Sequence, residues 1–321
     1  MATSAEAPTP PQAHPATPAS PQPPGTPGPR PRRRRPSWAG LWFVLPFVAC
    51  YALFLLWPSL TMFVDSFTNR SLAGGETSWV GLDNWATVLT DPAMWQSLWI
   101  TLLFTLISVP PLVILGLALA LLTDHARRAG WFLRLSFFAP FVLPVAVMTE
   151  IWGFMYQPGF GIINQYLGAL GLPQPEWLGS ENTVLIAIVI ATVWWTVGFN
   201  FVLYLAALQG IPRETYDAAS IDGSGAWQRI WHVTLPQLRR TTVLVIVLQM
   251  IASLRIFDQA YLLGGHFGGP NFASRTIIHY VYETGFVNFQ IGMASAMAWV
   301  FFVIIGLISV FQFRLLTRNE D

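Results

Sequence analysis

Six long apolar stretches, separated by polar segments, dominate the pattern along this chain. Four of them carry no charged residue, namely 38–57, 92–123, 182–212 and 284–313. Two others hold charge inside them, since 135–156 contains Glu150 and 241–263 contains Arg255 and Asp258. A helix of about 20 apolar residues spans the ~30 Å hydrocarbon core of a bilayer. The pattern therefore predicts an all-α, polytopic membrane protein with six transmembrane helices.

A different pattern precedes the first stretch. Residues 1–36 hold 12 of the chain's 25 prolines and almost no large apolar side chain, so they cannot bury enough surface to offset the entropy of ordering. We expect a disordered, Pro/Arg-rich cytoplasmic tail over 1–36, followed by a transmembrane domain over 37–321. A secretory signal peptide would have a shorter apolar core and a cleavage site after it, so we expect the first helix to be retained.

Arginine placement predicts the orientation of the spans. With the amino-terminal tail inside, the inside segments collect 14 arginines and the outside segments hold two, Arg70 and Arg275. Short loops rich in arginine stay on the cytoplasmic side. Both termini are therefore predicted to be cytoplasmic in a multi-pass protein of the cell membrane. The run of four arginines at 32–35 is explained by this topology and by anionic lipid, so no nucleic-acid partner is expected.

The amino-acid composition excludes several kinds of protein and catalytic site. The chain is 54% hydrophobic and 10% charged, too little charge to cover a globular surface in water. All 17 basic residues are arginine, so neither a Walker A loop nor a Schiff-base lysine is possible. Cys50 is the single cysteine and the five histidines are scattered, so no metal ligand set and no catalytic residue is predicted. We expect no cofactor on this chain and no enzymatic activity of its own.

An ionisable residue at the centre of a transmembrane helix raises the free energy of membrane insertion by about 2.5–3.5 kcal/mol. Such residues are therefore candidates for a functional role. Arg255 and Asp258 either neutralise each other at i, i+3 or line a translocation path. Glu150 either contacts a substrate hydroxyl or cationic group, or pairs with Arg255. Asn200 and Tyr204 lie on one helical face and serve either substrate hydroxyls or interhelical hydrogen bonds. These five form the candidate substrate pathway.

The predicted cytoplasmic loop at 211–240 has an organised local pattern. Pro212 suits the start of a short helix, and Gly223 and Gly225 permit a sharp turn after it. A second short helix is expected from Ser224 or Gly225 until Pro236 interrupts it. Small side chains on the first helix permit close approach of a partner.

The loop resembles the EAA loop of binding-protein-dependent ABC importer permeases, whose usual form is Glu-Ala-Ala, three residues, Gly, nine residues and Ile-x-Leu-Pro. Asp217-Ala218-Ala219, Gly223 and Val233-Thr234-Leu235-Pro236 stand at those positions. Asp217, Val233 and Ser224 depart conservatively from the usual residues. The resemblance implies that the loop 211–236 couples to an ATPase through a set of eight residues: Tyr216, Asp217, Ala218, Ala219, Asp222, Gly223, Leu235 and Pro236.

Further phrases resemble the carbohydrate branch of these permeases, and within it the MalF-like subunit. They lie at 80–85, 161–164, 177–178, 205–212, 257–261 and 268–270, so the resemblance covers about 41–316. It implies a type I ABC importer permease fold that forms half of a pathway for a sugar or oligosaccharide. The partners implied are a second, MalG-like permease, an ABC ATPase dimer that holds ATP and magnesium on the cytoplasmic side, and an extracytoplasmic solute-binding protein.

Three alternatives stay open at this point. The same architecture would serve for glycerol phosphate or another polar solute, which Arg255 favours. A secondary transporter would typically show repeated halves or matched broken helices, and no repeat is visible. A membrane enzyme is disfavoured, because no loop carries clustered His, Cys or carboxylate residues.

Overall fold

The structure, a computed structural model, describes residues 39–125 and 130–317. The chain divides into two units, Met1–Phe54 and Leu55–Asp321. The described part of the first unit is helix α1 (Ala39–Tyr51) and the start of a π-helical turn, Ala52–Leu56. The predicted tail over 1–36 lies outside the described residues.

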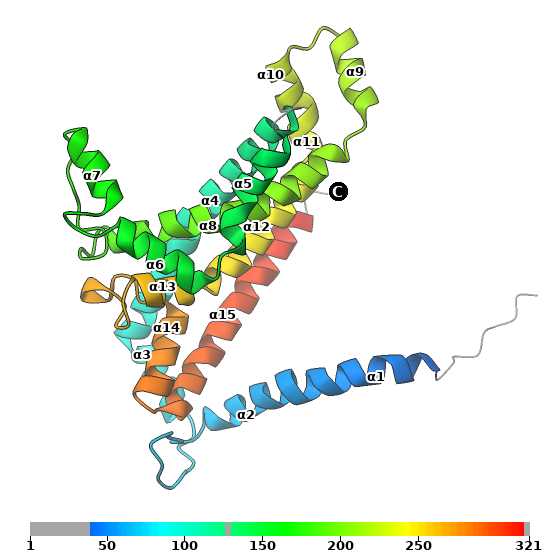
Figure 1. The fold of residues 1–321 in the computed structure, drawn as a ribbon. Helices are drawn as coiled ribbons and strands as arrows, with labels where there is room; N and C mark the ends of the chain where they lie inside the picture. The colour runs from blue at the N-terminus through cyan, green and yellow to red at the C-terminus, as the bar shows by residue number, and fades with distance from the viewer. Residues whose placement is uncertain (1–38, 126–129, 318–321) are drawn as a thin grey trace, which may run out of the picture. The chain divides into compact units, whose positions relative to one another are not determined.

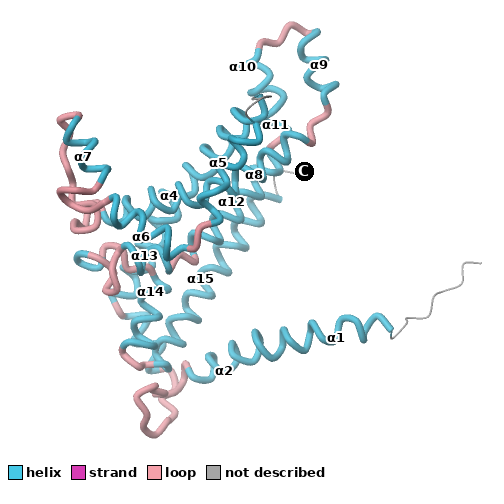
Figure 2. The backbone as a smooth tube through the Cα atoms, in the orientation of Figure 1, coloured by secondary structure: helices cyan, strands magenta, loops and turns pink. Residues whose placement is uncertain are grey.

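The second unit is built from helices joined by loops (Figure 1, Figure 2). In chain order the helices are α2 (Trp57–Asp65), α3 (Asp83–Thr90), α4 (Pro92–His125), α5 (Gly130–Val142), α6 (Val145–Met155), α7 (Ile162–Ala169), α8 (Val184–Gln209), α9 (Arg213–Ile221), α10 (Ala226–Arg229), α11 (Leu235–Gln237), α12 (Arg239–Leu254), α13 (Asp258–Leu263), α14 (Ile277–Tyr282) and α15 (Ile291–Thr317). Within 39–125 and 130–317 no strand forms, apart from isolated bridges that join Thr68 to Trp79 and Ser71 to Gln290. The predicted all-α class is confirmed.

The six predicted spans correspond to four helices and two bent pairs, the second of which also includes residues before the predicted fifth span. Trp42–Asp65, Pro92–Asp124, Val184–Gln209 and Ile291–Gln312 are each long and apolar enough to cross a membrane. The pair α5–α6 and the pair formed by 226–237 with α12 also qualify when each bent pair is counted as one span. By length and composition, the number six is therefore supported, and two of the predicted spans are not continuous helices.

The third predicted span, 135–156, is broken near its middle. Helix α5 ends at Val142, α6 begins at Val145, and the two helices bend by 97°. Pro144 causes the break, because it has no N–H to donate and pushes the preceding residue out of the helical region. The break frees the carbonyl of Leu143, and the indole Nε1–H of Trp195 donates to that oxygen at 3.0 Å. The expectation of one continuous helix here was wrong.

The fifth predicted span, 241–263, ends early. Helix α12 stops at Leu254, Arg255 is its C-cap, and α13 begins at Asp258. Arg255 therefore lies at a helix C-terminus, where a cation is favoured, instead of inside a span. The freed carbonyl of Ile256 accepts a hydrogen bond from the Thr276 hydroxyl at 3.0 Å. The prediction that both charges lie within one continuous span is thus corrected.

The core of the second unit depends on close contact between α4 and α8, which pack along each other more extensively than any other pair of elements (Figure 1). A Cβ added at Gly116 of α4 would lie 2.8 Å from the Cβ of Asn200 and 3.3 Å from its carbonyl carbon. Asn200 in turn donates through Nδ2 to the Leu112 carbonyl at 3.2 Å and accepts from Gln249 Nε2 at 2.7 Å. One buried amide thus ties α8 to both α4 and α12.

We predict that Gly116→Ala destabilises the protein by about 1–3 kcal/mol, because the methyl group forces α8 away from α4 and strains the Asn200 hydrogen bonds. Thermal unfolding of the purified protein measures the effect. Gly306→Ala, in helix α15, is the matched control, since a Cβ there meets nothing within 4 Å. Equal unfolding temperatures for the two variants would contradict this account of the α4–α8 contact.

Candidate functional site

The predicted loop at 211–236 forms a helical hairpin. Pro212 is the N-cap of α9, as expected, and the helix ends at Ile221. Gly223 adopts φ +80°, the Gly223 N–H donates to the Ser220 carbonyl at 3.1 Å, and the Ser224 N–H donates to the Ala219 carbonyl at 3.0 Å. This pair of bonds is a Schellman motif, which requires a left-handed residue that glycine adopts without strain. The turn predicted at Gly223 is therefore present and well defined.

The second arm of the hairpin is longer than expected. It begins at α10 after the N-cap Gly225 and continues through a π-helical turn, Ile230–Thr234, into α11. Pro236 lies inside this arm, and the interruption comes at Leu238, where the axis bends by 64° before α12. Pro236 does not interrupt the arm because it lies in the first turn of α11, where a proline's missing N–H is tolerated.

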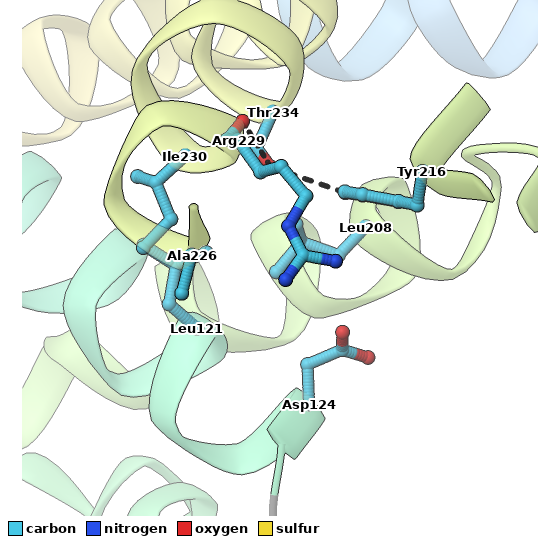
Figure 3. A pocket seen from close by; sticks show the side chains of 8 residues that line it. All are labelled: Leu121, Asp124, Leu208, Tyr216, Ala226, Arg229, Ile230 and Thr234. Atoms are coloured by element: carbon cyan, nitrogen blue, oxygen red, sulfur yellow. Dashed lines mark hydrogen bonds between the residues drawn. The ribbon is translucent and has the colours of Figure 1, made fainter. Parts of the chain in front are cut away.

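Polar side chains bind the two arms to each other. The Tyr216 hydroxyl lies 3.2 Å from Thr234 Oγ1, and Arg229 Nη1 donates to Ser220 Oγ at 3.1 Å. These arms cover a pocket of about 370 Å³ against the ends of α4 and α8, into which the Arg229 side chain extends on the side where Asp124 lies (Figure 3). Tyr216 thus faces the inside of the hairpin and holds it together.

The opposite side of the hairpin is open. Asp217, Ala218 and Asp222 are exposed, and Ile221 is 87% exposed although its side chain is apolar. Of the other predicted coupling residues, Ala219 and Leu235 are half-buried, while Gly223 and Pro236 are exposed. A short helix that combines small, acidic and unpartnered apolar side chains offers a surface for another protein.

A polar cavity of about 210 Å³ lies where the broken fifth span ends. Arg255 and Asp258, both exposed, line it together with polar residues of α8, α12 and α13. These polar residues are Thr192, Thr196, Gln249, Ser253 and Gln259. Gln249 had a signal in the sequence, as a lone amide in an apolar run, whereas Thr192 and Thr196 looked like ordinary span residues. The wall offers several hydrogen-bonding groups and both signs of charge.

Of the two alternatives for Arg255 and Asp258, the ion pair between them does not form. Arg70 pairs with Asp65 and Arg275 with Glu283, but neither Arg255 nor Asp258 is found in an ion pair in the described part of the chain. The i, i+3 spacing assumed a continuous helix, and the break at Arg255 removes it. The alternative pairing of Glu150 with Arg255 is likewise absent from the described part of the chain.

The remaining pathway candidates lie elsewhere. Asn200 is buried and makes the interhelical bonds described above, which is the structural alternative for this residue. Tyr204 is fully buried among apolar side chains, in a cluster with Ala120, Phe201 and Leu238. Glu150 is exposed on α6 and is not part of the cavity wall. The structure therefore gathers two of the five candidates, Arg255 and Asp258, at the cavity.

A buried arginine occupies the loop after α13. This residue is Arg275, and its Nη1 lies 3.4 Å from Glu283 Oε2. Its guanidinium carbon lies 4.1 Å from the ring centre of Phe272 and 4.4 Å from the ring centre of Tyr280. The flat guanidinium is thus held by cation–π contacts and one carboxylate. Sequence patterns did not single out Arg275 beyond its count as an outside charge.

His279 is fully buried beside this arginine. Its Nε2 lies 3.0 Å from the carbonyl oxygen of His266. Burial lowers the pKa of His279, and Arg275 adds to this, whereas the bond to His266 and the charge of Glu283 oppose it. Within the described residues, no group of three or more His, Cys, Asp or Glu side chains is arranged to hold a metal ion.

Comparison with known proteins shows which family this chain belongs to. Residues 97–320 match the family described as "Binding-protein-dependent transport system inner membrane component". The chain belongs to this family. As a family member it is a membrane component of a transport system and is not a catalytic subunit.

Relatives in the family are similar over most of their length. The trehalose/maltose transport system permease protein MalF of Thermococcus litoralis is 33% identical over 272 residues, which cover 84% of this chain and 91% of MalF. The sulfoquinovosyl glycerol transport system permease protein SmoG of Agrobacterium fabrum is 31% identical over 277 residues, which cover 86% of this chain and 89% of SmoG. The sn-glycerol-3-phosphate transport system permease protein UgpA of the same organism is 31% identical over 279 residues, 86% of this chain and 94% of UgpA.

A solved structure shares the fold. A chain of a bacterial ABC transporter involved in the import of the acidic polysaccharide alginate superposes with a TM-score of 0.76 at 21% identity. The match covers 88% of this chain and 96% of that chain. The type I ABC importer permease fold expected from the sequence is thereby confirmed.

The lowered pKa of His279 predicts how stability depends on pH. The folded state holds His279 neutral, whereas the unfolded chain gains a proton below about pH 6.5, so stability is lost as the pH falls through that value. His279→Gln keeps an N–H donor for the His266 carbonyl and does not titrate. We expect its unfolding temperature to fall less than that of the wild type between pH 7.5 and 5.5. The exposed His232→Gln controls for the loss of a histidine, and identical pH profiles of the wild type and His279→Gln would contradict the assignment.

Proposed function

We propose that this chain is the MalF-like permease subunit of an ATP-driven sugar importer, with both termini in the cytoplasm. The observation that carries the proposal is the hairpin of α9 to α11, whose turn fixes an exposed helix with the residues of the EAA loop. The named relatives, which transport trehalose and maltose or sulfoquinovosyl glycerol, support a sugar as the solute.

In this proposal the outer side of α9 is the docking surface for a separate ATPase, through Asp217, Ala218, Ile221 and Asp222. A chain without lysine cannot form a Walker A loop, so ATP and magnesium belong to that partner. A second, MalG-like permease completes the pathway. A solute-binding protein docks at the other end of the spans, and a solved relative of the same fold was determined with an alginate pentasaccharide-bound periplasmic protein.

The hairpin transmits motion of the ATPase as a rigid piece. The Tyr216–Thr234 and Arg229–Ser220 bonds hold the two arms to each other. A displacement of α9 therefore moves the second arm with it, and the bend at Leu238 passes the movement to α12. Such a rigid-body shift switches the spans between inward-open and outward-open states.

The polar cavity is the proposed contact with the solute. Threonine hydroxyls and glutamine amides suit the hydroxyl groups of a sugar, and Trp195 supplies an aromatic surface in the same wall. A second candidate solute is glycerol phosphate. Arg255 is exposed at the cavity without an ion-pair partner among the described residues, so it could meet a phosphate group. The similarity to UgpA, at 31% identity, also supports this solute.

The turn at Gly223 tests the docking proposal. Gly223→Val places a β-branched residue at φ +80°, at a cost of roughly 1–2 kcal/mol or more, and reorients the end of α9. We expect the amount of ATPase that co-purifies to fall at least about tenfold, with membrane insertion unchanged. Gly225→Val is the matched control, since Gly225 has φ −69° and a Cβ there would meet Gln228 Oε1 only at an ordinary contact distance of 3.9 Å. Undiminished co-purification with Gly223→Val would refute the docking surface.

Filling the cavity tests the pathway. Thr196→Trp occupies the space between α8 and α12, and we expect uptake of radiolabelled trehalose, maltose or sn-glycerol 3-phosphate, whichever the wild type takes up, to fall at least about tenfold. Co-purification of the ATPase should not change. Val202→Trp is the control, because Val202 is an exposed residue of the same helix that is not part of the cavity wall. Normal uptake by Thr196→Trp would exclude this cavity from the path.

A further inference from the structure

Besides the hairpin pocket and the polar cavity, a groove of about 420 Å³ lies between α4 and α8, at the end of these helices opposite the hairpin. Its floor follows one face of α4, through Trp99, Ile100, Leu103 and Ile107, and is completed by Leu185 and Ile186 of α8. Trp99 is 62% exposed and Ile186 is 46% exposed, so the groove opens on the surface of the helix pair.

Polar and apolar side chains are separated along this groove. Gln96, Glu181, Asn182 and Asn271 gather at the end where α4 and α8 begin, while the lining deeper along the helices is apolar. From Gln96 to Ile107 is 11 residues, or about 16 Å at 1.5 Å per residue. That length matches half of the ~30 Å hydrocarbon core, which is one leaflet of the bilayer.

The charge of the groove selects among amphipathic molecules. Glu181 is the charged residue of the lining, and Asn271 Nδ2 donates to its Oε2 at 3.1 Å, which holds the carboxylate at the polar end. An anionic headgroup would be repelled there. An ammonium group is attracted, and a primary ammonium also donates hydrogen bonds to the carboxylate and to the amide oxygens of the neighbouring residues. Trp99 lies about one turn after Gln96 on α4, next to the polar end of the groove, and indole rings are favoured at the membrane interface.

We propose that this groove is a binding site for one phospholipid with a primary amine headgroup, of the phosphatidylethanolamine type, with an acyl chain along Trp99, Leu103 and Ile107. Its headgroup ammonium meets Glu181 and its acyl chain fills the apolar half of the groove. The bound lipid holds α4, the start of α8 and the loop at Asn271 together. In the proposed orientation the lipid comes from the outer leaflet, and the site does not depend on which solute is carried.

The test uses the full-length protein, with the subunits that co-purify with it, in nanodiscs that contain a trace of phosphatidylethanolamine or phosphatidylcholine with a photoreactive acyl chain. After irradiation, labelled peptides are identified by mass spectrometry. We expect the amine lipid to label the segments around Leu103 and Ile186 roughly two- to fivefold more than the choline lipid, the range for a single exposed ion pair. Glu181→Gln should remove this preference while some labelling of both lipids remains.

Matched variants test the groove itself. Leu103→Trp fills the apolar half, so labelling by both lipids should be lost, whereas Ile114→Trp, on the same face of α4 and beyond the groove, should have no effect. Equal labelling by the two lipids in the wild type, or an unchanged preference in Glu181→Gln, would overturn the proposal. So would crosslinking of the groove to another subunit in place of lipid. Co-purification of the ATPase reports the importer proposal separately.

Discussion

The demand that every backbone polar group in lipid finds a partner inside the protein organises this molecule. Helices meet that demand by themselves, and side chains help to meet it at the break between α5 and α6 and at the end of α12. The Trp195 indole N–H donates a hydrogen bond to the Leu143 carbonyl at the break between α5 and α6. The Thr276 hydroxyl donates one to the Ile256 carbonyl after α12. Trp195 and Ile256 both line the polar cavity. The cavity therefore lies beside the end of α12, next to one residue from each of these two hydrogen bonds.

One helix connects this cavity to the hairpin. Helix α12 has 16 residues, about 24 Å, and runs from the bend after Leu238 to its C-cap Arg255 at the cavity wall. Asn200 and Gln249 fasten its middle to α8. In the proposed mechanism, a displacement of the hairpin would reach the cavity through α12. The proposed docking surface and the cavity then lie toward opposite ends of this helix, and the Asn200–Gln249 contact between them is the point about which the helix would turn.

Sequence patterns predicted what depends on local chemistry. The number of spans followed from apolar length, and the turn at Gly223 followed from the need for a left-handed residue. The breaks at Pro144 and Arg255 were not predicted. The apolar composition of a stretch indicates that it can lie in lipid, but it does not indicate where its helix bends or ends. For Arg255 and Asp258 the sequence left two roles open, a self-neutralising pair or part of a pathway, and the end of α12 at Leu254 removes the continuous helix that the pair required. Asn200 was open to two roles, and only the facing side chain of Gln249, 49 positions away, distinguishes them.

The bend in the third span also affects the surrounding bilayer. Helix α4, with 34 residues, extends about 51 Å, whereas α5, with 13 residues, extends about 20 Å before the chain turns away by 97°. A straight segment of 20 Å falls well short of a ~30 Å hydrocarbon core, and such a hydrophobic mismatch is relieved by local thinning of the membrane or by oligomerisation. The flank formed by α5 and α6 thus has a different membrane thickness requirement from the flank formed by α4. A bilayer with a thinner hydrocarbon core would fit α5 better than α4, so the two helices place different demands on the same membrane.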